Sequence, residues 1–509
     1  MFHISCSTKL ASIEEIRDNR IKKLEELRKF DINPYPAKSG RNFSIADILT
    51  DFDNLAQDKK EVILAGRITS LRGQGALIFV DLKDGSGSIQ LFFKKDNFSD
   101  SDFEKLQNLF DIGDIVESGG ILFVTKRGEK TLEVKNFRIL TKSLRPIPTE
   151  FYGLSDIEER YRRRYLDLLL NDDVREKFIK RSKIINVLRE FYNTKGYLEV
   201  ETPILQTIPG GATAKPFKTH LNALDLDLYL RIAPELYLKR LLVGGFEKVY
   251  EIGRCFRNEG MDATHNPDFT MLESYSAYEN YKDLMIMVER LMEFLIAKIY
   301  PDAENYRIEY KEQKIIFKAP YMIIEFTELL KEHFKIDYDE MSEDELFKFA
   351  EKEIKNRKSD LKLKQGMHKG KIADELYKEF IRSEIIQPIF MINHPLELSP
   401  LAKKTEENPL KVERFQLIVA GIELMNGYSE LNDPIDQHKR FREQENIGKS
   451  GDEEVQRLDI DYIEALEYGM PPAAGLGIGV ERLVMLLTDS QTLRESMLFP
   501  TMKPRGEGR

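Results

Sequence analysis

The sequence has little cysteine and no long apolar run, and both absences exclude classes of protein. Cys6 and Cys255 are the only cysteines among 509 residues. Two thiols so far apart in the chain favour neither a disulfide framework nor a cysteine zinc site. No stretch reaches the roughly 18–20 consecutive apolar residues of a membrane helix, and residues 1–10 lack the apolar run of a signal peptide. We therefore expect a cytoplasmic protein that does not associate with a membrane.

Length and composition indicate the number of domains but do not determine the function. A chain of 509 residues predicts two or more domains, and its 41% hydrophobic content suits globular cores. Lys and Arg total 77 against 87 Asp and Glu, so the net charge is −10. This excess of negative charge argues weakly against nucleic-acid binding over the whole surface, but a local basic patch on one domain is not excluded.

The first part of the chain predicts a helical extension and a small barrel. Residues 12–30 carry an apolar stripe among many charges, and we assign residues 1–58 to an N-terminal helical extension. Residues 59–145 contain three strand patterns, a helical pattern and two more strand patterns, an order typical of an OB-fold barrel. The strands are expected at 62–71, 76–83, 88–93, 115–124 and 131–140, and the helix at 102–110.

The rest of the chain predicts an α+β domain. Residues 146–170 are interpreted as a linker, and residues 171–509 as the second domain. Strands and helices mix there without a regular βαβ rhythm, which favours a mainly antiparallel sheet flanked by helices. Residues 303–385 are rich in charge and predict a helical insertion, to which the sequence assigns no chemistry.

A candidate hairpin between residues 256 and 275 carries side chains suited to a nucleotide. Side chains alternate along a strand, so alternate residues of each arm are expected to share a face. An arginine fork binds phosphate, a carboxylate accepts from an exocyclic amine, and an aromatic ring stacks on a base. A charged, solvated hairpin is the alternative. The residues concerned are Arg257 and Glu259 on the first arm, and Phe269, Met271, Glu273 and Tyr275 on the second.

Two further segments frame this hairpin. Gly475, Gly477 and Gly479 alternate along one strand, which leaves one face bare for a ligand, although a tightly packed strand is the alternative. Val480 stands where a dinucleotide fingerprint needs glycine. Upstream, a long helix ends in the segment 196–203, whose pattern alone indicates only structure.

In this order, the three segments resemble motifs one, two and three of the class II aminoacyl-tRNA synthetases. A preceding OB-fold barrel is similar to the lysine, aspartate and asparagine branch of that family, and the resemblance covers nearly the whole chain. It implies ATP as co-substrate, Mg²⁺ as cofactor, tRNA as acceptor and a homodimer that pairs around residues 174–205.

The charge of the candidate pocket favours lysine as the amino acid. A buried ammonium without a partner costs several kcal/mol, so a lysine pocket needs carboxylates, whereas an aspartate pocket needs a cation. Glu430 and Glu235 make this pocket anionic. Their surroundings, 426–433 and 232–240, and the segment 208–212 resemble lysyl-tRNA synthetases, so the resemblance implies ligation of L-lysine to tRNA(Lys).

The resemblance also implies a role for each matching residue. Arg257 and Arg482 are expected to be catalytic by binding the α- and γ-phosphates, and Glu423 is expected to bind Mg²⁺ with Gln416, where the family pattern has Glu. Glu430 and Tyr275 are expected at the ε-ammonium, with Glu235, Glu273 and the Gly211 backbone at the α-amino group. The ATP site would comprise Arg257, Glu259, His265, Phe269, Glu423 and Arg482; the lysine site Gly211, Glu235, Glu273, Tyr275, Asn426, Tyr428, Glu430 and Gly477.

In the barrel, the resemblance implies that Phe79 and Gln90 read the anticodon and that Arg72 contacts the tRNA backbone. Gln90 and Phe92 are expected on the strand face opposite Ile89, Leu91 and Phe93, which should form the core. A core position for Phe79 is the alternative.

Three other functions are consistent with parts of the pattern. The nearest is an aspartate or asparagine ligase of the same branch, which the anionic pocket disfavours. A synthetase-like RNA-binding protein without catalysis is disfavoured by the complete set Arg257, Glu259, Phe269 and Arg482. An enzyme that transfers lysine to a protein would resemble the second domain but would lack the barrel.

Overall fold

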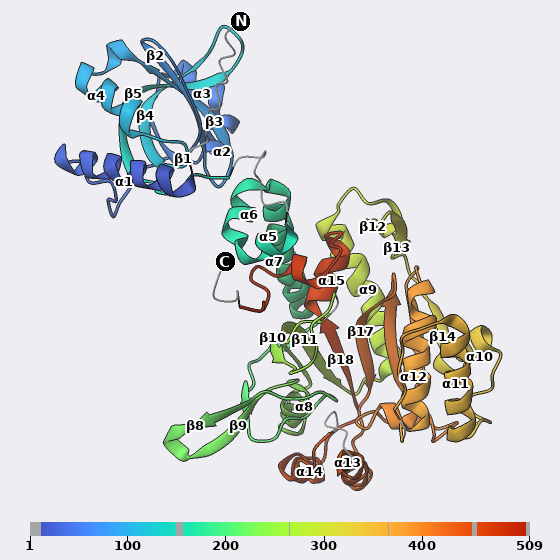
Figure 1. The fold of residues 1–509 in the computed structure, drawn as a ribbon. Helices are drawn as coiled ribbons and strands as arrows, with labels where there is room; N and C mark the ends of the chain where they lie inside the picture. The colour runs from blue at the N-terminus through green and yellow to red at the C-terminus, as the bar shows by residue number, and fades with distance from the viewer. Residues whose placement is uncertain (1–11, 149–155, 264, 365, 450–455, 505–509) are drawn as a thin grey trace, which may run out of the picture. The chain divides into compact units, whose positions relative to one another are not determined.

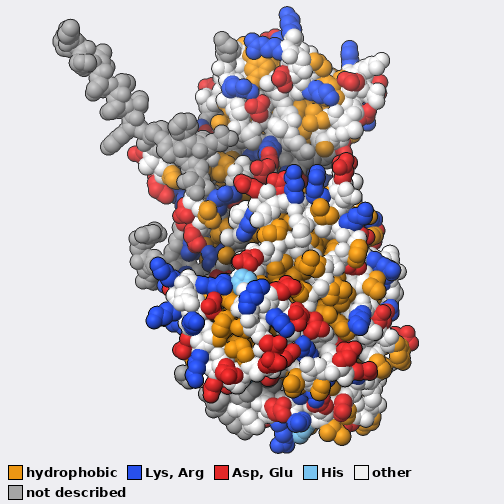
Figure 2. All heavy atoms as spheres, turned by 90° about the vertical axis from the view of Figure 1, so that its right-hand side faces the viewer, with side chains coloured by type: hydrophobic (Ala, Val, Ile, Leu, Met, Phe, Trp, Pro, Cys, Tyr) orange, Lys and Arg blue, Asp and Glu red, His pale blue; other side chains and the backbone are white. Residues whose placement is uncertain are grey.

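The chain forms two compact units, Met1–Ser155 and Asp156–Arg509. The computed structural model describes residues 12–148, 156–263, 265–364, 366–449 and 456–504 (Figure 1). Over these ranges, none of the helices is long and apolar enough to span a membrane. Figure 2 shows acidic and basic side chains interspersed over one face of the molecule, as expected from the modest net charge.

The N-terminal unit is a closed five-stranded barrel with strand order β1-β2-β3-β5-β4. This confirms the predicted OB-fold barrel. A helix, α4, separates the third and fourth strands, and three helices precede the first strand. The elements are α1 (Ile13–Lys29), α2 (Ile45–Thr50), α3 (Phe52–Gln57), β1 (Val62–Gln74), β2 (Leu77–Lys83), β3 (Ser88–Lys94), α4 (Asp100–Leu109), β4 (Ile115–Val124) and β5 (Lys130–Thr141).

Alternation of apolar and polar residues positions the barrel strands. On β3, Ile89, Leu91 and Phe93 are buried in the barrel core, and the residues between them face outward, as predicted. The same period holds on β2, where Ile78 and Val80 are buried. A strand with this pattern buries one whole side, so a shift by one residue would expose its core face.

The C-terminal unit contains an eight-stranded sheet in the order β14-β15-β16-β17-β18-β11-β10-β6. Only β14 with β15 and β10 with β6 pair in parallel, which confirms a mainly antiparallel sheet. The strands are β6 (Leu198–Glu199), β10 (Lys248–Phe256), β11 (Asp268–Ala277), β14 (Met322–Glu325), β15 (Ile389–Ile392), β16 (Arg414–Val419), β17 (Ile422–Ser429) and β18 (Ala473–Gly479).

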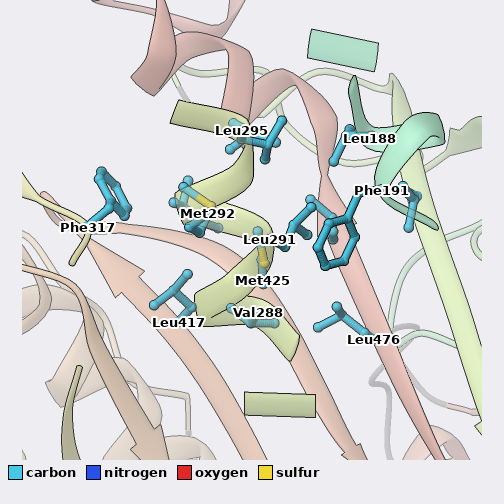
Figure 3. Packing of buried hydrophobic residues seen from close by; sticks show 14 of the residues in the cluster. Leu188, Phe191, Val288, Leu291, Met292, Leu295, Phe317, Leu417, Met425 and Leu476 are labelled. Atoms are coloured by element: carbon cyan, nitrogen blue, oxygen red, sulfur yellow. The ribbon is translucent and has the colours of Figure 1, made fainter. Parts of the chain in front are cut away.

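Two helices, α7 (Asp172–Thr194) and α9 (Tyr281–Ile299), cover one face of this sheet. Their apolar sides meet the apolar side chains of β16, β17 and β18 in one core (Figure 3). The residues that Figure 3 labels are Leu188, Phe191, Val288, Leu291, Met292, Leu295, Phe317, Leu417, Met425 and Leu476. The side chains that alternate with this core along the strands are thereby directed to the opposite face.

The remaining elements surround the sheet. They are α5 (Ile157–Arg162), α6 (Arg164–Leu170), β7 (Leu205–Gln206), β8 (Lys218–Leu221), β9 (Leu226–Leu230), α8 (Glu235–Val243), β12 (Arg307–Tyr310), β13 (Gln313–Ile316), α10 (Phe326–Phe334), α11 (Glu343–Arg357), α12 (Lys369–Phe380), α13 (Pro434–Lys449), α14 (Ile460–Glu467) and α15 (Val480–Leu487).

Two segments differ from the sequence-based description. Residues 303–385 are not wholly helical, because they begin with the hairpin β12–β13 and with β14, which joins the main sheet. These strands are only four residues long and lie among charges, so their period of two was too short to detect. Within the expected linker 146–170, α5 and α6 belong to the C-terminal unit, where Arg164 is buried and pairs with Asp167.

Candidate active site

A cavity of about 540 Å³ opens in the C-terminal unit. All the residues predicted from the sequence to contact ATP, lysine or metal line it, with one exception: Glu430 lies behind the lining and is almost fully buried. The lining set is Gly211, Glu235, Arg257, Glu259, His265, Phe269, Glu273, Tyr275, Gln416, Glu423, Asn426, Tyr428, Gly477 and Arg482.

The glycines of β18 form part of this lining. Leu476 and Ile478 belong to the helix-covered core, and Gly475, Gly477 and Gly479, which alternate with them, line the cavity. A Cβ atom on Gly475 would lie 2.1 Å from Oε1 of Glu430 and 2.4 Å from the ring of Tyr275. Gly475 is therefore required to be glycine by close packing of the pocket wall.

Glu235, Lys239 and Tyr428 form a hydrogen-bonded network at the inner end of the cavity. Glu235 opens α8, and its Oε1 accepts from the Tyr428 hydroxyl at 2.6 Å. The ammonium of Lys239, one turn later on α8, lies 2.5 Å from the same oxygen and also pairs with Glu430. Burial acts to lower the pKa of Lys239, but the two carboxylates outweigh it and raise the pKa, so Lys239 is charged.

Glu273 adds a further buried carboxylate to the pocket. Its Oε2 accepts from the Tyr275 hydroxyl at 3.1 Å. Burial raises the pKa of Glu273 to about 8, the Glu235 carboxylate adds to the rise, and Tyr275 opposes it. Two carboxylates, those of Glu235 and Glu430, thus pair with the Lys239 ammonium, and Glu273 leaves the pocket with a further acidic group, which suits a ligand that brings positive charge.

Arg257 lies just beyond the end of β10, not within the strand, so its position does not come from strand alternation. Its backbone N–H donates to the Pro267 carbonyl at 2.8 Å, which closes the hairpin. Its guanidinium lies 5.0 Å from the ring centroid of Phe269, and its buried Nε has no hydrogen-bond partner among the described residues. A buried donor left open in this way is available to an anion.

Arg482 occupies the first turn of α15 and faces the same cavity. Its Nη1 donates to the main-chain carbonyl of Glu423 at 3.1 Å, and its Nη2 lies 3.5 Å from Nε2 of His265. Nδ1 of His265 lies 2.9 Å from Asp262, which orients the ring. Burial lowers the pKa of Arg482, but the group is still a cation near neutrality.

Glu481 links three segments that are far apart in the chain. One oxygen accepts from Arg181 of α7 at 2.9 Å, and the other accepts from the backbone N–H of Thr270 on β11 at 2.8 Å. Glu481 itself belongs to α15 and is 2% exposed. This buried carboxylate fixes α15, and with it Arg482, against the hairpin that carries Arg257.

The cavity wall offers oxygen donors to a metal ion. Gln416 on β16 and Glu423 on β17 both line it. In the part of the chain that the structure describes, no group of three or more His, Cys, Asp or Glu side chains is placed to hold a metal by itself. A carboxylate and an amide oxygen fit Mg²⁺, which commonly takes one or two protein ligands together with substrate phosphates.

Comparisons with known proteins agree with this architecture. The family described as tRNA synthetases class II (D, K and N) matches residues 156–503, and the OB-fold nucleic acid binding domain matches residues 62–140. The lysine–tRNA ligase of Pelotomaculum thermopropionicum is 47% identical over 503 residues, covering 99% of this chain and 97% of the relative. That of Carboxydothermus hydrogenoformans is 47% identical over 493 residues, covering 97% and 99%. The chain belongs to the class II tRNA synthetases of the D, K and N group.

Sequence reasoning missed several residues of this class II synthetase site. Lys239 and Arg414 were not considered; the Arg414 side chain donates to Asn426 at 2.7 Å and so orients it in the cavity wall. The signal for Lys239 was its place four residues after Glu235, where two side chains share a helix face. The insertion also contributes lining residues that no motif indicated: His368, Lys371, Asp374, Lys378 and Arg382.

In the barrel of the synthetase, the residues predicted to contact the anticodon lie on adjacent strands. Arg72 on β1 is paired in register with Phe79 on β2, and Phe79 with Phe92 on β3. Phe79 is half-buried outside the barrel core, and its ring centroid lies 5.0 Å from that of Phe92. Gln90, on the same face of β3 as Phe92, accepts from the Thr131 hydroxyl at 3.2 Å.

Proposed function

We propose that this protein is a lysine–tRNA ligase, which activates L-lysine with ATP and transfers it to the 3′ end of tRNA(Lys), releasing AMP and pyrophosphate. The observation that carries the proposal is the set of three buried acidic residues, Glu235, Glu273 and Glu430, of which Glu235 and Glu430 share the internal ammonium of Lys239. Relatives that share 46–47% identity over nearly the whole chain bear the name lysine–tRNA ligase, which supports the same conclusion.

In the first step, the lysine carboxylate attacks the α-phosphorus of ATP and pyrophosphate leaves. The carboxylate is already ionised at neutral pH, so this step needs no general base. It needs alignment of the reacting atoms and positive charge where the phosphate charge develops. Arg257 supplies that charge from one side, and Arg482, fixed by Glu481, binds the far end of the triphosphate.

The amino acid is held by charge complementarity. Glu430 and Tyr275 would accept from the ε-ammonium, and Glu235, Glu273 and the backbone of Gly211 would bind the α-amino group. Asn426, Tyr428 and Gly477 would complete the walls. For ATP, Glu259 would accept from the adenine amine, Phe269 would stack on the base, and His265 would assist at the phosphates.

Glu423 and Gln416 would hold magnesium, which adds positive charge next to the phosphates. Because Gln416 brings no charge, we expect the protein itself to bind this ion more weakly than a pair of carboxylates would. In the second step, a hydroxyl of the terminal ribose of tRNA attacks the lysyl carbonyl carbon and AMP leaves.

The outer face of the barrel would bind the anticodon. Unpaired bases stack on aromatic rings and are read at their edges, roles that suit Phe79 and Gln90, with Arg72 at the backbone. The enzyme would form a homodimer through residues 174–205 and act in the cytoplasm, where translation takes place. Four large apolar side chains of this segment are exposed, which supports the dimer: Ile179, Leu198, Ile204 and Leu205. Light scattering, which measures the molar mass in solution, tests whether the protein is a dimer.

Amino-acid-dependent exchange between ATP and pyrophosphate tests the proposal. We expect exchange with lysine and none with aspartate or asparagine. Exchange with aspartate or asparagine instead would overturn the pocket assignment but keep the reaction class. A folded sample that supports no exchange with any of the three would favour an RNA-binding protein without catalysis.

A further inference from the structure

The insertion, residues 303–385, forms part of the wall of the cavity. Side chains of α12 and of the following 3-10 turn, η5 (Arg382–Glu384), line the same cavity as Arg257 and Arg482. Arg382 is half-buried there. The insertion therefore does more than pack on the sheet, and its charged residues require an explanation.

The backbone segment that carries Arg382 is held against the sheet. The N–H of Gly421 donates to the Ile385 carbonyl at 2.8 Å, and that of Ala420 donates to the Ile386 carbonyl at 3.0 Å. Ala420 and Gly421 form the turn between β16 and β17, directly before Glu423. A Cβ atom on Gly421 would lie 3.2 Å from Cα of Ser383, so the two turns are in close contact. The backbone of η5 is thereby fixed beside the candidate metal ligands.

The charge of Arg382 is not neutralised by a neighbouring carboxylate. Among the described residues, its guanidinium forms no hydrogen bond or ion pair with a protein group. Other cations of this wall do have partners, since Lys378 lies 2.6 Å from Asp374 and Lys371 lies 3.4 Å from Glu375. An arginine in a cavity wall whose guanidinium has no protein partner can bind an anion.

Two more guanidiniums face the same space and, among the described residues, form no hydrogen bond or ion pair with a side-chain carboxylate. Arg482 donates to a main-chain carbonyl, and Arg257 rests on an aromatic ring. Arg257, Arg382 and Arg482 come from three different parts of the chain and line the same cavity. Like charges repel one another, and a polyanion bound between them would offset that repulsion.

We propose that Arg382 binds the β- and γ-phosphates of ATP as a third arginine beside Arg482 and Arg257, and retains the pyrophosphate as it leaves. This inference rests on the proposed function. It assigns Arg382 to the β,γ end because η5 is anchored at the turn before Glu423, whose carbonyl binds Arg482. Gln416 adds no negative charge to attract metal at this end, so a fixed guanidinium compensates for it.

Binding of nucleotides with different numbers of phosphates tests the proposal. Calorimetric titration of the full chain with ATP, pyrophosphate and AMP is compared for the wild type, Arg382→Gln and Arg382→Lys. We expect Arg382→Gln to weaken ATP and pyrophosphate binding about 10- to 100-fold, the size of a lost charge-assisted hydrogen bond, and to leave AMP binding unchanged. Arg382→Lys should recover part of the loss.

A matched control is Arg307→Gln. Arg307 lies on β12 in the same insertion, is exposed and does not line the cavity, so this variant should bind all three ligands like the wild type. Equal weakening of ATP and AMP in Arg382→Gln would indicate a structural role and overturn the proposal, as would unchanged ATP binding. A wild type that binds neither ATP nor pyrophosphate would overturn the proposed function as well.

Discussion

The ammonium of Lys239 pairs with the carboxylate of Glu430, and neither side chain is exposed to solvent. The same ammonium reaches Glu235, so one internal cation serves two carboxylates. Glu273 is a third acidic group of the pocket, and burial raises its pKa to about 8, so it is neutral in the empty pocket at neutral pH. When a bound ammonium ionises Glu273, the two ammonium groups of a lysine substrate and that of Lys239 would match three carboxylates, which makes Lys239 part of the charge match that selects the amino acid.

Removing the cation of this pair should destabilise the protein. Lys239→Met keeps most of the side-chain volume but leaves Glu235 and Glu430 without their partner. Loss of one partner of a buried pair costs about 3–5 kcal/mol, and we expect the free energy of unfolding to fall by that amount in urea titrations. Lys298→Met is the control, since Lys298 forms an ion pair at the surface. Equal stability of the two variants would contradict the ion pair.

Glu430→Gln should discriminate between the two substrates. The change removes the charge expected to face the ε-ammonium, whereas the ATP-binding residues keep their positions. The KM for lysine should rise at least about 10-fold, on the scale of a hydrogen bond to a charged group, and the KM for ATP should change little. Equal losses for both substrates in steady-state exchange would argue against a side-chain contact.

Arg257→Ala should slow the formation of the adenylate. The guanidinium is expected to stabilise charge at the α-phosphorus in the transition state. Removal of one such donor commonly costs about 100-fold or more, so ATP–pyrophosphate exchange should fall by at least that factor. Near-normal exchange in a folded Arg257→Ala variant would remove this residue from the mechanism.

Lysine binding should release a proton below pH 8. Burial and the Glu235 carboxylate raise the pKa of Glu273 to about 8, so the empty pocket carries a protonated Glu273 at neutral pH. An arriving ammonium favours the ionised form and lowers this pKa, so the proton leaves. The KM for lysine should therefore fall as the pH rises from 6.5 to 8 and level off above 8.

Calorimetry in buffers of different ionisation enthalpy measures this proton directly. The heat of lysine binding should depend on the buffer at pH 7, with the sign of proton release, and the released fraction should fall as the pH rises to 8. Glu273→Gln should abolish the dependence at pH 7, where the substrate itself does not titrate. A buffer-independent heat at pH 7 in the wild type would show that Glu273 is already ionised.

Phe79→Ala should separate the two steps of the reaction. The ring lies outside the barrel core next to Phe92, so its removal should leave the barrel folded and exchange at the wild-type rate. Loss of one base–aromatic stack costs about 1–3 kcal/mol, so the KM for tRNA should rise roughly 5- to 100-fold. Unchanged lysylation would leave Phe79 without a role in tRNA binding.

The sequence predicted the barrel well in part because buried and more exposed residues alternate along β2 and β3. Ile89, Leu91 and Phe93 could be assigned to the core from the period alone, and β3 was expected to end within one residue of its position. The second arm of the hairpin and the glycine strand were also located correctly, but Arg257 and Glu259 lie beyond the end of the first arm. Short strands such as β12 and β13 were not, since four residues give two periods at most.

The electrostatic details of the site could not be read from the pattern. Lys239 lies in a helix with a second basic residue, Arg240, and a lysine there is usually exposed. Its burial depends on Glu430, almost two hundred residues away in the chain. Arg382 was missed for a similar reason, because only the contact between η5 and the turn at Gly421 brings it to the cavity.

Glu481 limits which substitutions the protein tolerates, because it bonds to two other segments of the chain. Its two oxygens join α7 through Arg181 and β11 through the N–H of Thr270, while its own helix carries Arg482. Residues that share one buried network do not vary independently in their effects. A chimera that takes α15 from a distant relative would need a matching residue at position 181. Substitutions in the three segments are therefore expected to be coupled, although Arg181 and Thr270 lie 300 and 211 residues before Glu481 in the chain.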